Sequence, residues 1–226
     1  MIYNNIVKGK FISRPNRFIA HVEIDGKLEV CHVKNTGRCK ELLIPGATVF
    51  VQLSDNPARK TKYDLISVFK GDMLINMDSQ APNKVFGEWV ANSGFFKDIM
   101  FVKPECKYKN SRFDYYIETQ GHKIFAEVKG VTLEREGVVS FPDAPTERGI
   151  KHINELVEAK NNGYEAYVCF IVQMSRCRYF TPASDKHPEF AEALKSASRN
   201  GVRVIALNCD VTPTMLQAKD FVAVCL

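Results

Sequence analysis

The stretch FAEVKGVTL, residues 125–133, decides how the rest of the chain is interpreted. It is apolar enough for a buried β-strand, yet it carries Glu127 and Lys129 two positions apart. Side chains two residues apart on a strand share a face, and adjacent ones point to opposite faces. The pattern therefore predicts that Glu127 and Lys129 lie side by side, while Ala126 and Val128 face the other way.

A Glu-x-Lys pair is weak evidence by itself, because this chain contains three of them. One falls in a predicted helix, where residues two apart do not face each other. Another lies on a predicted strand that follows no strand with an aspartate. Only the pair in the quoted stretch has an aspartate on the strand before it. The three pairs, in chain order, are Glu105/Lys107, Glu127/Lys129 and Glu158/Lys160.

The preceding strand, SRFDYY at 111–116, supplies Asp114. A tight turn at Gln120-Gly121 predicts an antiparallel hairpin that places Asp114 opposite a residue near 127, on one face. Two neighbouring carboxylates repel one another unless a cation lies between them. Mg²⁺ or Mn²⁺ resolves the repulsion, because such hard ions take few carboxylates and complete their shell with water and phosphate oxygens. The sequence therefore predicts a metal site at Asp114 and Glu127.

Two further residues extend the predicted site. Lys129 would stabilise an attacking hydroxide or a charged phosphorane, with the metal as Lewis acid. Glu88, on the helix predicted before these strands, would add a third carboxylate. This arrangement follows the plan of the PD-(D/E)xK nucleases. The predicted catalytic residues are Asp114, Glu127, Lys129 and Glu88, and the predicted metal ligands are Asp114, Glu127 and Glu88.

Two features depart from that plan. The residue before Asp114 is Phe113 instead of proline, and the pair Pro142-Asp143 comes after Glu-x-Lys, in the wrong order. We expect Asp143 to line the cleft from a loop. The competing interpretation is a set of surface ion pairs, which contribute little to stability. Those pairs would join Glu127 to Lys129 and Asp114 to Arg112 or Lys123.

A second layer of side chains is predicted around the site. Residues 147–162 are expected to form a helix between Thr146 as N-cap and Gly163 as its stop. Three basic residues at spacing i, i+3, i+4 form a strip that either holds a phosphate backbone or is a solvated helix face. Gln173 ends an apolar strand and is a candidate substrate ligand. The strip consists of Arg148, Lys151 and His152.

Residues 81–226 form the predicted nuclease-like domain, a mixed sheet flanked by helices. The stretch DSQAPN marks a boundary near residue 80, and Asn83 is the expected N-cap of a helix over 84–95. Three antiparallel strands follow, and then helices that alternate with buried strands. The segment 134–146 is expected to be a long loop.

Residues 1–80 form the other predicted domain, an OB-like β-barrel. Short alternating stretches predict strands, and Asp25-Gly26 between two of them is a strong hairpin signal. The stretch TGRCKELLIPG at 36–46 is expected to form one or two helical turns. Such barrels often bind single-stranded nucleic acid through aromatic and basic side chains, although Phe18 in the core and a solvated arginine rim would explain the pattern as well. The candidate nucleic-acid-binding residues are Arg14, Arg17, Phe18, His32 and Arg38.

Composition narrows the classes of function. The 226 residues are 45% hydrophobic and 25% charged, as in an ordinary globular protein. Residues 1–80 carry 12 Lys and Arg against 8 Asp and Glu, which is +4 of the net +5 and is compatible with a nucleic-acid partner. Seven dispersed cysteines without CxxC pairing predict a reducing cytoplasm, and no apolar run reaches membrane-spanning length. A homodimer stays open, since nucleases that cut both strands commonly pair.

The whole chain resembles the sugar fermentation stimulation protein A family of bacteria and archaea. The resemblance is carried by RPNRFIAHV, CHVKNTGRCKELLIPG, RKTKYDLI, SRFDYYI, EVKGVTL, FPDAPTERGIKHINEL and FIVQ. It implies an N-terminal OB-like domain, a C-terminal nuclease-like domain and DNA binding. On that pattern Asp114, Glu127 and Lys129 occupy the nuclease motif positions, with Glu88 on the preceding helix.

Two functions follow as expectations, with DNA favoured over RNA as the partner. The first is a DNA-binding protein that hydrolyses phosphodiesters with Mg²⁺ or Mn²⁺. The alternative is a non-catalytic, DNA-binding transcriptional regulator of sugar (maltose) metabolism, in line with the family's name. A small-molecule hydrolase or a pure interaction module is disfavoured, because the chain shows no nucleophile elbow, phosphate loop or nucleotide fingerprint.

Overall fold

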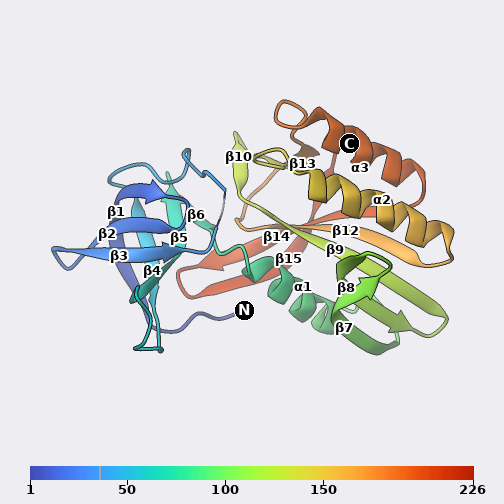
Figure 1. Ribbon diagram of the computed structural model, residues 1–226, viewed down its shortest axis with the longest axis horizontal. Helices are drawn as coiled ribbons and strands as arrows, with labels where there is room; N and C mark the ends of the chain where they lie inside the picture. The colour runs from blue at the N-terminus through green and yellow to red at the C-terminus, as the bar shows by residue number, and fades with distance from the viewer. Residues whose placement is uncertain (36) are drawn as a thin grey trace.

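The computed structural model describes residues 1–35 and 37–226 and contains two β-sheets, which form two lobes (Figure 1). The first sheet is built entirely from the N-terminal part of the chain, in the order β3-β2-β1-β4-β5-β6. Its strands are β1 (Ile6–Asn16), β2 (Ile19–Ile24), β3 (Lys27–Val33), β4 (Thr48–Leu53), β5 (Tyr63–Lys70) and β6 (Met73–Asn76).

The first five strands close into a barrel, because β3 also pairs in parallel with β5. Alternating residues such as Val22, Val49 and Leu65 are fully buried and fill its interior. The hairpin between β2 and β3 turns at Asp25 and Gly26, which have φ values of 49° and 76°. Two consecutive left-handed residues are what a two-residue hairpin turn of the primed type requires. The expected OB-like barrel is confirmed.

Of the one or two helical turns expected over 36–46, the described part has a single turn closed by an i, i+4 hydrogen bond, in which Leu43 N donates to Cys39 O at 2.9 Å, and it has no helix. Cys39 has a φ of 45°, outside the range of a right-handed helix. The Arg14 guanidinium donates hydrogen bonds of 2.7 to 2.8 Å to the carbonyl oxygens of residues 35, 37 and 38. Those acceptors are therefore already used by a side chain. Thr36 lies outside the described residues.

The second sheet has nine strands in the order β10-β11-β13-β15-β14-β12-β9-β8-β7. It mixes parallel and antiparallel pairs, and the most buried strand, β12, runs parallel to both neighbours, β9 and β14. The strands are β7 (Ile99–Tyr108), β8 (Ser111–Thr119), β9 (His122–Val131), β10 (Leu133–Arg135), β11 (Val138–Phe141), β12 (Glu165–Val172), β13 (Tyr179–Pro182), β14 (Arg203–Thr212) and β15 (Met215–Val224).

Helices cover both faces of this sheet, as the predicted fold class requires. Helix α1 (Ala81–Asn92) lies on one face, and α2 (Glu147–Asn161) and α3 (Pro188–Arg199) lie on the other (Figure 1). On the α1 side, Val85 and Phe86 share a core cluster with Ala126 and Val128 of β9. Because neighbouring strand residues point to opposite faces, Glu127 points toward α2.

Two boundaries differ from expectation. Helix α1 begins at Ala81 with Pro82 in its first turn, a position where the missing N–H of proline costs nothing. Asn83 therefore lies inside the helix and is not its N-cap. The expected long loop holds β10 and β11, and β13 and β15 are also strands that the sequence did not reveal. Except for β15, these are short strands, too short for alternation to identify.

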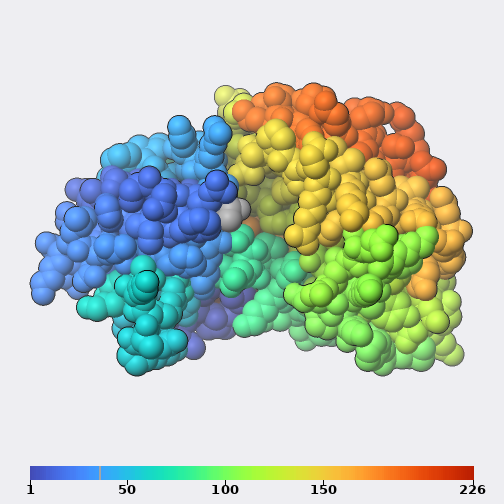
Figure 2. Space-filling view, viewed as in Figure 1, coloured from blue at the N-terminus to red at the C-terminus, as the bar shows by residue number. Residues whose placement is uncertain are grey.

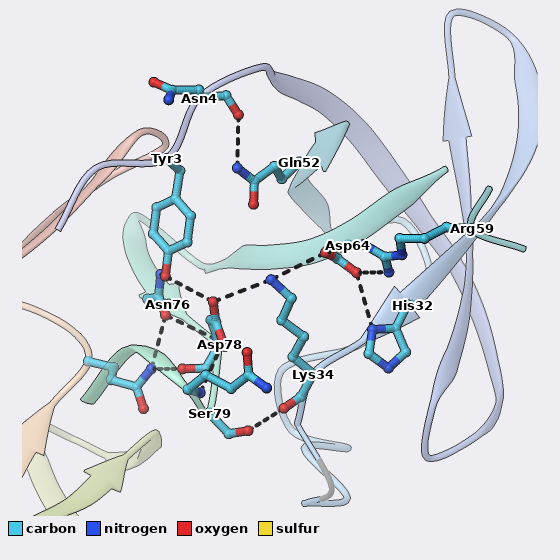
Figure 3. A network of polar contacts seen from close by, with 12 residues as sticks. Tyr3, Asn4, His32, Lys34, Gln52, Arg59, Asp64, Asn76, Asp78 and Ser79 are labelled. Carbon is cyan, nitrogen blue, oxygen red and sulfur yellow. Dashed lines mark hydrogen bonds and ion pairs between the residues drawn. The ribbon is translucent and has the colours of Figure 1, made fainter. Parts of the chain in front are cut away.

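The two lobes meet through a buried polar network. Asn76 N donates to Gln173 O at 2.9 Å, and Gln173 Nε2 donates back to Asn76 Oδ1 at 2.9 Å and to Asp78 O at 3.0 Å. The Tyr3 hydroxyl contacts both Asn76 and Asp78, and Lys34 bridges Asp78 to Asp64 (Figure 3). Among the described helices, none combines the length and apolar character needed to span a membrane.

Candidate metal and nucleic-acid site

The β8–β9 hairpin brings Asp114 and Glu127 together, in the predicted register. Tyr115 pairs with Ala126 as the last pair of the ladder, so Asp114 lies where the ladder ends, close enough to Glu127 for the two charges to interact. The ladder ends there, because the Asp114 carboxylate takes over: its Oδ2 accepts the backbone N–H of Val128 at 2.7 Å. The carboxylate thus replaces a strand partner at the point where the site begins.

Glu127 is buried, with 2% of its surface exposed. Its Oε1 accepts two short hydrogen bonds, at 2.6 Å from Lys129 Nζ and at 2.6 Å from His152 Nδ1. His152 Nε2 in turn accepts from Arg148 Nε at 3.4 Å, which leaves Nδ1 as the donor to Glu127. Glu127 Oε2 is buried and has no hydrogen-bond partner among the described residues. Buried carboxylate oxygens without a partner are uncommon, and Glu155 Oε2 is the other one in the described chain, so Glu127 Oε2 is free to accept a bond from outside the chain.

Charge distinguishes the two carboxyls. Burial, and then the neighbouring Glu127 charge, raise the pKa of Asp114, although Val128 N–H, Lys129 and Asn83 partly offset them. Burial also raises the pKa of Glu127, but the His152 hydrogen bond and the Lys129 ammonium outweigh it, so this pKa lies below its usual range. One cation therefore serves two buried carboxyls.

The exposed ion pairs of the competing interpretation are not what these residues form. The Glu127–Lys129 pair exists, but it is buried and not at a surface edge. Asp114 bonds to Asn83 Nδ2 at 2.9 Å, from α1. The two cations suggested for Asp114 pair elsewhere: Arg112 with Glu105, and Lys123 with Glu118.

Glu88 does not join the other two carboxylates, which corrects the prediction of a third ligand. It is about half exposed, and its Oε2 lies 2.5 Å from the amino group of Met1. The reason is the helix phase: Val85, Phe86 and Trp89 are buried against the sheet, and Asn83, not Glu88, reaches Asp114. No group of three or more Asp, Glu, His or Cys side chains suited to a metal occurs in 1–35 and 37–226.

Asp114 and Glu127 nevertheless fit a hard divalent ion. Mg²⁺ is commonly held by one or two carboxylates, with water and substrate phosphate completing its shell. The unpartnered Glu127 Oε2 and the raised pKa of Asp114 both describe a site with too little positive charge. These two residues could hold the metal, without Glu88.

A cleft of about 500 Å³ opens next to this pair, between the N-terminal lobe and α2 (Figure 2). Lys129 lines the cleft, and its Nζ donates to the buried Glu127 carboxylate, which therefore lies directly behind Lys129. Asp143 and Arg148 also line it, as expected for Asp143. Gln173 reaches the cleft as well, but its amide nitrogen is bound to the N-terminal lobe. Gly130, beside Lys129, has no room for a side chain, because a Cβ there would lie 2.5 Å from Gln173 Oε1 and 2.7 Å from Pro82 Cγ.

The predicted basic strip of α2 is divided between three environments. Arg148 is exposed at the cleft, and Lys151 points to solvent, where its Nζ lies 3.9 Å from Glu155. His152 is 5% exposed and bonds Glu127, so it is not part of an exposed phosphate-binding strip. The i, i+4 spacing was compatible with that strip, but the helix turns His152 toward the sheet.

The five candidate nucleic-acid-binding residues of the barrel fall into an exposed group and a group with structural partners. Arg17 and Phe18 are exposed, with the guanidinium 5.9 Å from the ring centroid, and Arg38 is exposed too. Phe18, at 51% exposure, is therefore not a core residue. Arg14 is occupied by four backbone carbonyls, and His32 Nδ1 lies 3.1 Å from Asp64, so both have structural partners.

Comparison with known proteins identifies the family. A family model described as the sugar fermentation stimulation protein RE domain matches residues 80–215, and one described as the SfsA N-terminal OB domain matches residues 12–77. The chain belongs to the sugar fermentation stimulation protein family. Proteins named as homologs in this family are 60% identical in Clostridium beijerinckii, over 100% of both chains, and 61% identical in Desulfitobacterium hafniense, over 99% of this chain and 98% of the other.

A solved member of the family has the same fold. The structure of SfsA from Pyrococcus furiosus, in complex with Ca²⁺, is 27% identical and aligns with a TM-score of 0.89. The alignment covers 100% of this chain and 98% of that one. The family predicted from the sequence motifs is confirmed.

Two contributors to the site were not assigned these roles from the sequence. Asn83 was taken for a helix cap, and His152 for a phosphate contact. Each reaches the site by a contact between elements far apart in the chain, from α1 to β8 and from α2 to β9. The only available signal was their place on helices predicted to flank the sheet.

Proposed function

We propose that this protein is a metal-dependent nuclease that acts on nucleic acid, with DNA as the first substrate to test. Residues 1–80 would bind the nucleic acid and residues 81–226 would cut it. The observation that carries the proposal is the unpartnered Oε2 of buried Glu127, beside Asp114 and next to a cleft lined by Lys129. The Ca²⁺ in the Pyrococcus relative supports a divalent ion in this family.

The residues divide the work of phosphodiester hydrolysis. Asp114 and Glu127 would hold Mg²⁺ or Mn²⁺, which supplies Lewis acidity and orients the substrate. His152 donates a hydrogen bond to Glu127 Oε1 and so holds the carboxylate in one orientation. Oε2 would then stay available for the metal. Lys129 is the ammonium placed to offset the negative charge that grows on the phosphate as water attacks and the P–O bond breaks. Arg148, exposed at the same cleft, is positioned to hold a flanking phosphate.

The decisive experiment is cleavage of supercoiled plasmid, circular single-stranded DNA and RNA with Mn²⁺ or Mg²⁺. We expect nicking by the wild-type protein, and its loss in Asp114→Ala and Lys129→Ala. Glu88→Gln is the matched control, since that carboxylate lies outside the site, and it should cut like wild type. If neither metal supports cleavage of any of the three substrates, the proposal is wrong.

Metal binding can be measured separately from cleavage. A ligand that binds only the folded state raises the unfolding temperature, and the stabilisation grows with the logarithm of the ligand concentration over Kd. We expect Mn²⁺ and Ca²⁺ to raise the unfolding temperature of wild type and Glu88→Gln, but not that of Glu127→Gln. Sequence-selective DNA binding in EDTA, with no cleavage in Mn²⁺, would instead favour a regulator that keeps the fold without the chemistry.

A further inference from the structure

Three hollows on the surface adjoin one another and connect the barrel to the cleft. A groove of about 610 Å³ on the barrel is lined by Arg17, Arg38 and Lys40, and it shares Gly37 with the cleft at Lys129. A third hollow of about 430 Å³ shares Arg38 and Lys40 with the groove, and Asp143 with the cleft. The groove and the cleft are therefore neighbours across the loop at Gly37.

Two routes lead from the groove to the cleft, one directly across Gly37 and one through the third hollow, and they differ in charge. Arg17, Arg38 and Lys40 in the groove, and Arg148 in the cleft, form no ion pair within the described ranges. The third hollow contains Glu41 and Glu134, which line neither the groove nor the cleft, and its cations other than the shared Arg38 and Lys40 are neutralised. Asp143 lines the cleft as well, so it does not distinguish the two routes. Lys70 pairs with Glu134, and both Arg135 and Lys186 pair with Asp185. A polyanion is therefore favoured along the direct route, from the groove across Gly37 into the cleft.

We propose that this direct route binds one single strand of nucleic acid, which runs from Arg17, Arg38 and Lys40 across Gly37 to Lys129 and Arg148. The proposal rests on the proposed function and names the form of its substrate. Unpaired cations at both ends would contact successive phosphates, and the strand would bring one phosphodiester to the cleft.

The geometry favours a single strand over a duplex. Phe18 is half exposed next to Arg17, which lines the groove and lies over its ring, and such an aromatic platform binds the faces of unpaired bases. Glu127 is 2% exposed and the Lys129 side chain 18%, so the reacting phosphate must enter a recess. A cleft of about 500 Å³ has the volume of a small-ligand pocket, which suits a nucleotide and not a paired helix.

Binding is tested without metal, so that cleavage plays no part. Fluorescence anisotropy in EDTA would compare a labelled 20-nucleotide oligo-dT with a 20-base-pair duplex between 50 and 200 mM salt, a choice guided by the salt dependence of phosphate contacts. We expect the single strand to bind more tightly than the duplex. Each of Arg38→Ala and Arg148→Ala should reduce the salt slope by about 0.7 and the affinity about fivefold at 100 mM salt. Lys27→Ala, an exposed cation on the distant β2–β3 hairpin, is the charge-matched control and should change neither.

Continuity of the route is tested by photo-crosslinking. A 12-nucleotide strand with 5-iodouracil at one end or the other is expected to label the peptide containing Phe18 from one end, and a peptide containing Lys129 or Arg148 from the other. Tighter binding of the duplex, a silent Arg148→Ala variant, or both ends labelling the barrel alone would each overturn the proposal. A protein that binds as expected but never cuts in Mn²⁺ would leave the route standing and overturn only the nuclease function.

Discussion

Two buried carboxylate clusters in this protein have opposite electrostatics. At the junction of the lobes, Asp64 accepts a bidentate pair from Arg59 at 2.6 and 2.9 Å, together with Lys34 at 3.2 Å and His32 at 3.1 Å (Figure 3). Burial raises the pKa of Asp64, but these partners outweigh it and lower the pKa to about 2.

The cluster at the cleft is under-compensated. Asp114 and Glu127 share a single ammonium, Lys129, and one buried oxygen of Glu127 has no partner in the described chain. The pKa of Asp114 is raised, mainly by burial and then by Glu127. A cluster that serves stability satisfies its charges internally, whereas one that awaits a cation does not. The difference between the two clusters is therefore evidence for a role of the second in binding.

The largest expected effect is on catalysis at the under-compensated cluster. Glu127→Gln keeps the shape of the side chain but removes its charge, so the metal loses a ligand, and we expect cleavage to fall on the order of a thousandfold. Glu105→Gln alters the same Glu-x-Lys pattern on β7, at the edge of the sheet, where Glu105 is exposed and pairs with Arg112. The initial nicking rate with Mn²⁺ should be low for Glu127→Gln and close to wild type for Glu105→Gln. Equal rates in the two variants would show that Glu127 has no part in cleavage.

The next effect concerns the free energy of unfolding, and it should be larger at the Asp64 cluster than at the Asp114 cluster. Asp64→Asn leaves Arg59 and Lys34 without their buried carboxylate, and we expect the free energy of unfolding to fall by about 3 kcal/mol. Asp114→Asn removes a charge that burial already disfavours, so its cost should stay within about 1 kcal/mol. Urea unfolding followed by circular dichroism measures both. A larger loss in Asp114→Asn than in Asp64→Asn would contradict the contrast between the clusters.

Acid should act on the junction in a defined window. The pKa of Asp64 is lowered from 3.8 to about 2 on folding, so its stabilisation is present above the unfolded pKa and is lost as the pH falls through the folded one. This contribution is about 2 kcal/mol and should disappear between about pH 4 and pH 2. Asp64→Asn should remove this part of the pH dependence. The check is urea unfolding of both proteins from pH 5 to pH 2, and parallel curves would refute it.

The smallest expected effect tests how Glu127 is held. His152→Ala removes the donor to Glu127 Oε1, and loss of such an outer contact should weaken Mn²⁺ binding about tenfold. His152→Asn places an amide N–H near the Nδ1 position and should restore part of the affinity. Isothermal titration with Mn²⁺ reads this out without cleavage. Weaker folding with unchanged Mn²⁺ affinity would make His152 a packing residue only.

Local patterns in the sequence were sufficient for the fold class and for the neighbourhood of Asp114, Glu127 and Lys129, whose role in a site stays a prediction. The alternation in 125–133 placed Glu127 and Lys129 on one face, and the tight turn at Gly121 fixed the register up to the pair of Tyr115 with Ala126, next to Asp114 and Glu127. Both depend on residues close together in the chain. The Asp25-Gly26 hairpin was predictable for the same reason.

Contacts between distant elements were not predictable. Glu88 was misplaced because the rotation of α1 follows from where it begins and from which residues pack on the sheet. His152 was misassigned because helix spacing cannot say which side of α2 faces β9. Arg14 looks like a nucleic-acid ligand in the sequence, and only the folded chain reveals the four carbonyl oxygens that occupy it.

Gly130 has a consequence for how this protein can vary. The backbone beside Lys129 passes so close to Gln173 and Pro82 that even a methyl group would have to push one of them aside. Gln173 is also the amide that ties the C-terminal lobe to Asn76. A methyl group at position 130 would therefore displace Gln173 and weaken its bond to Asn76, and it would widen the cleft beside Lys129 at the same time.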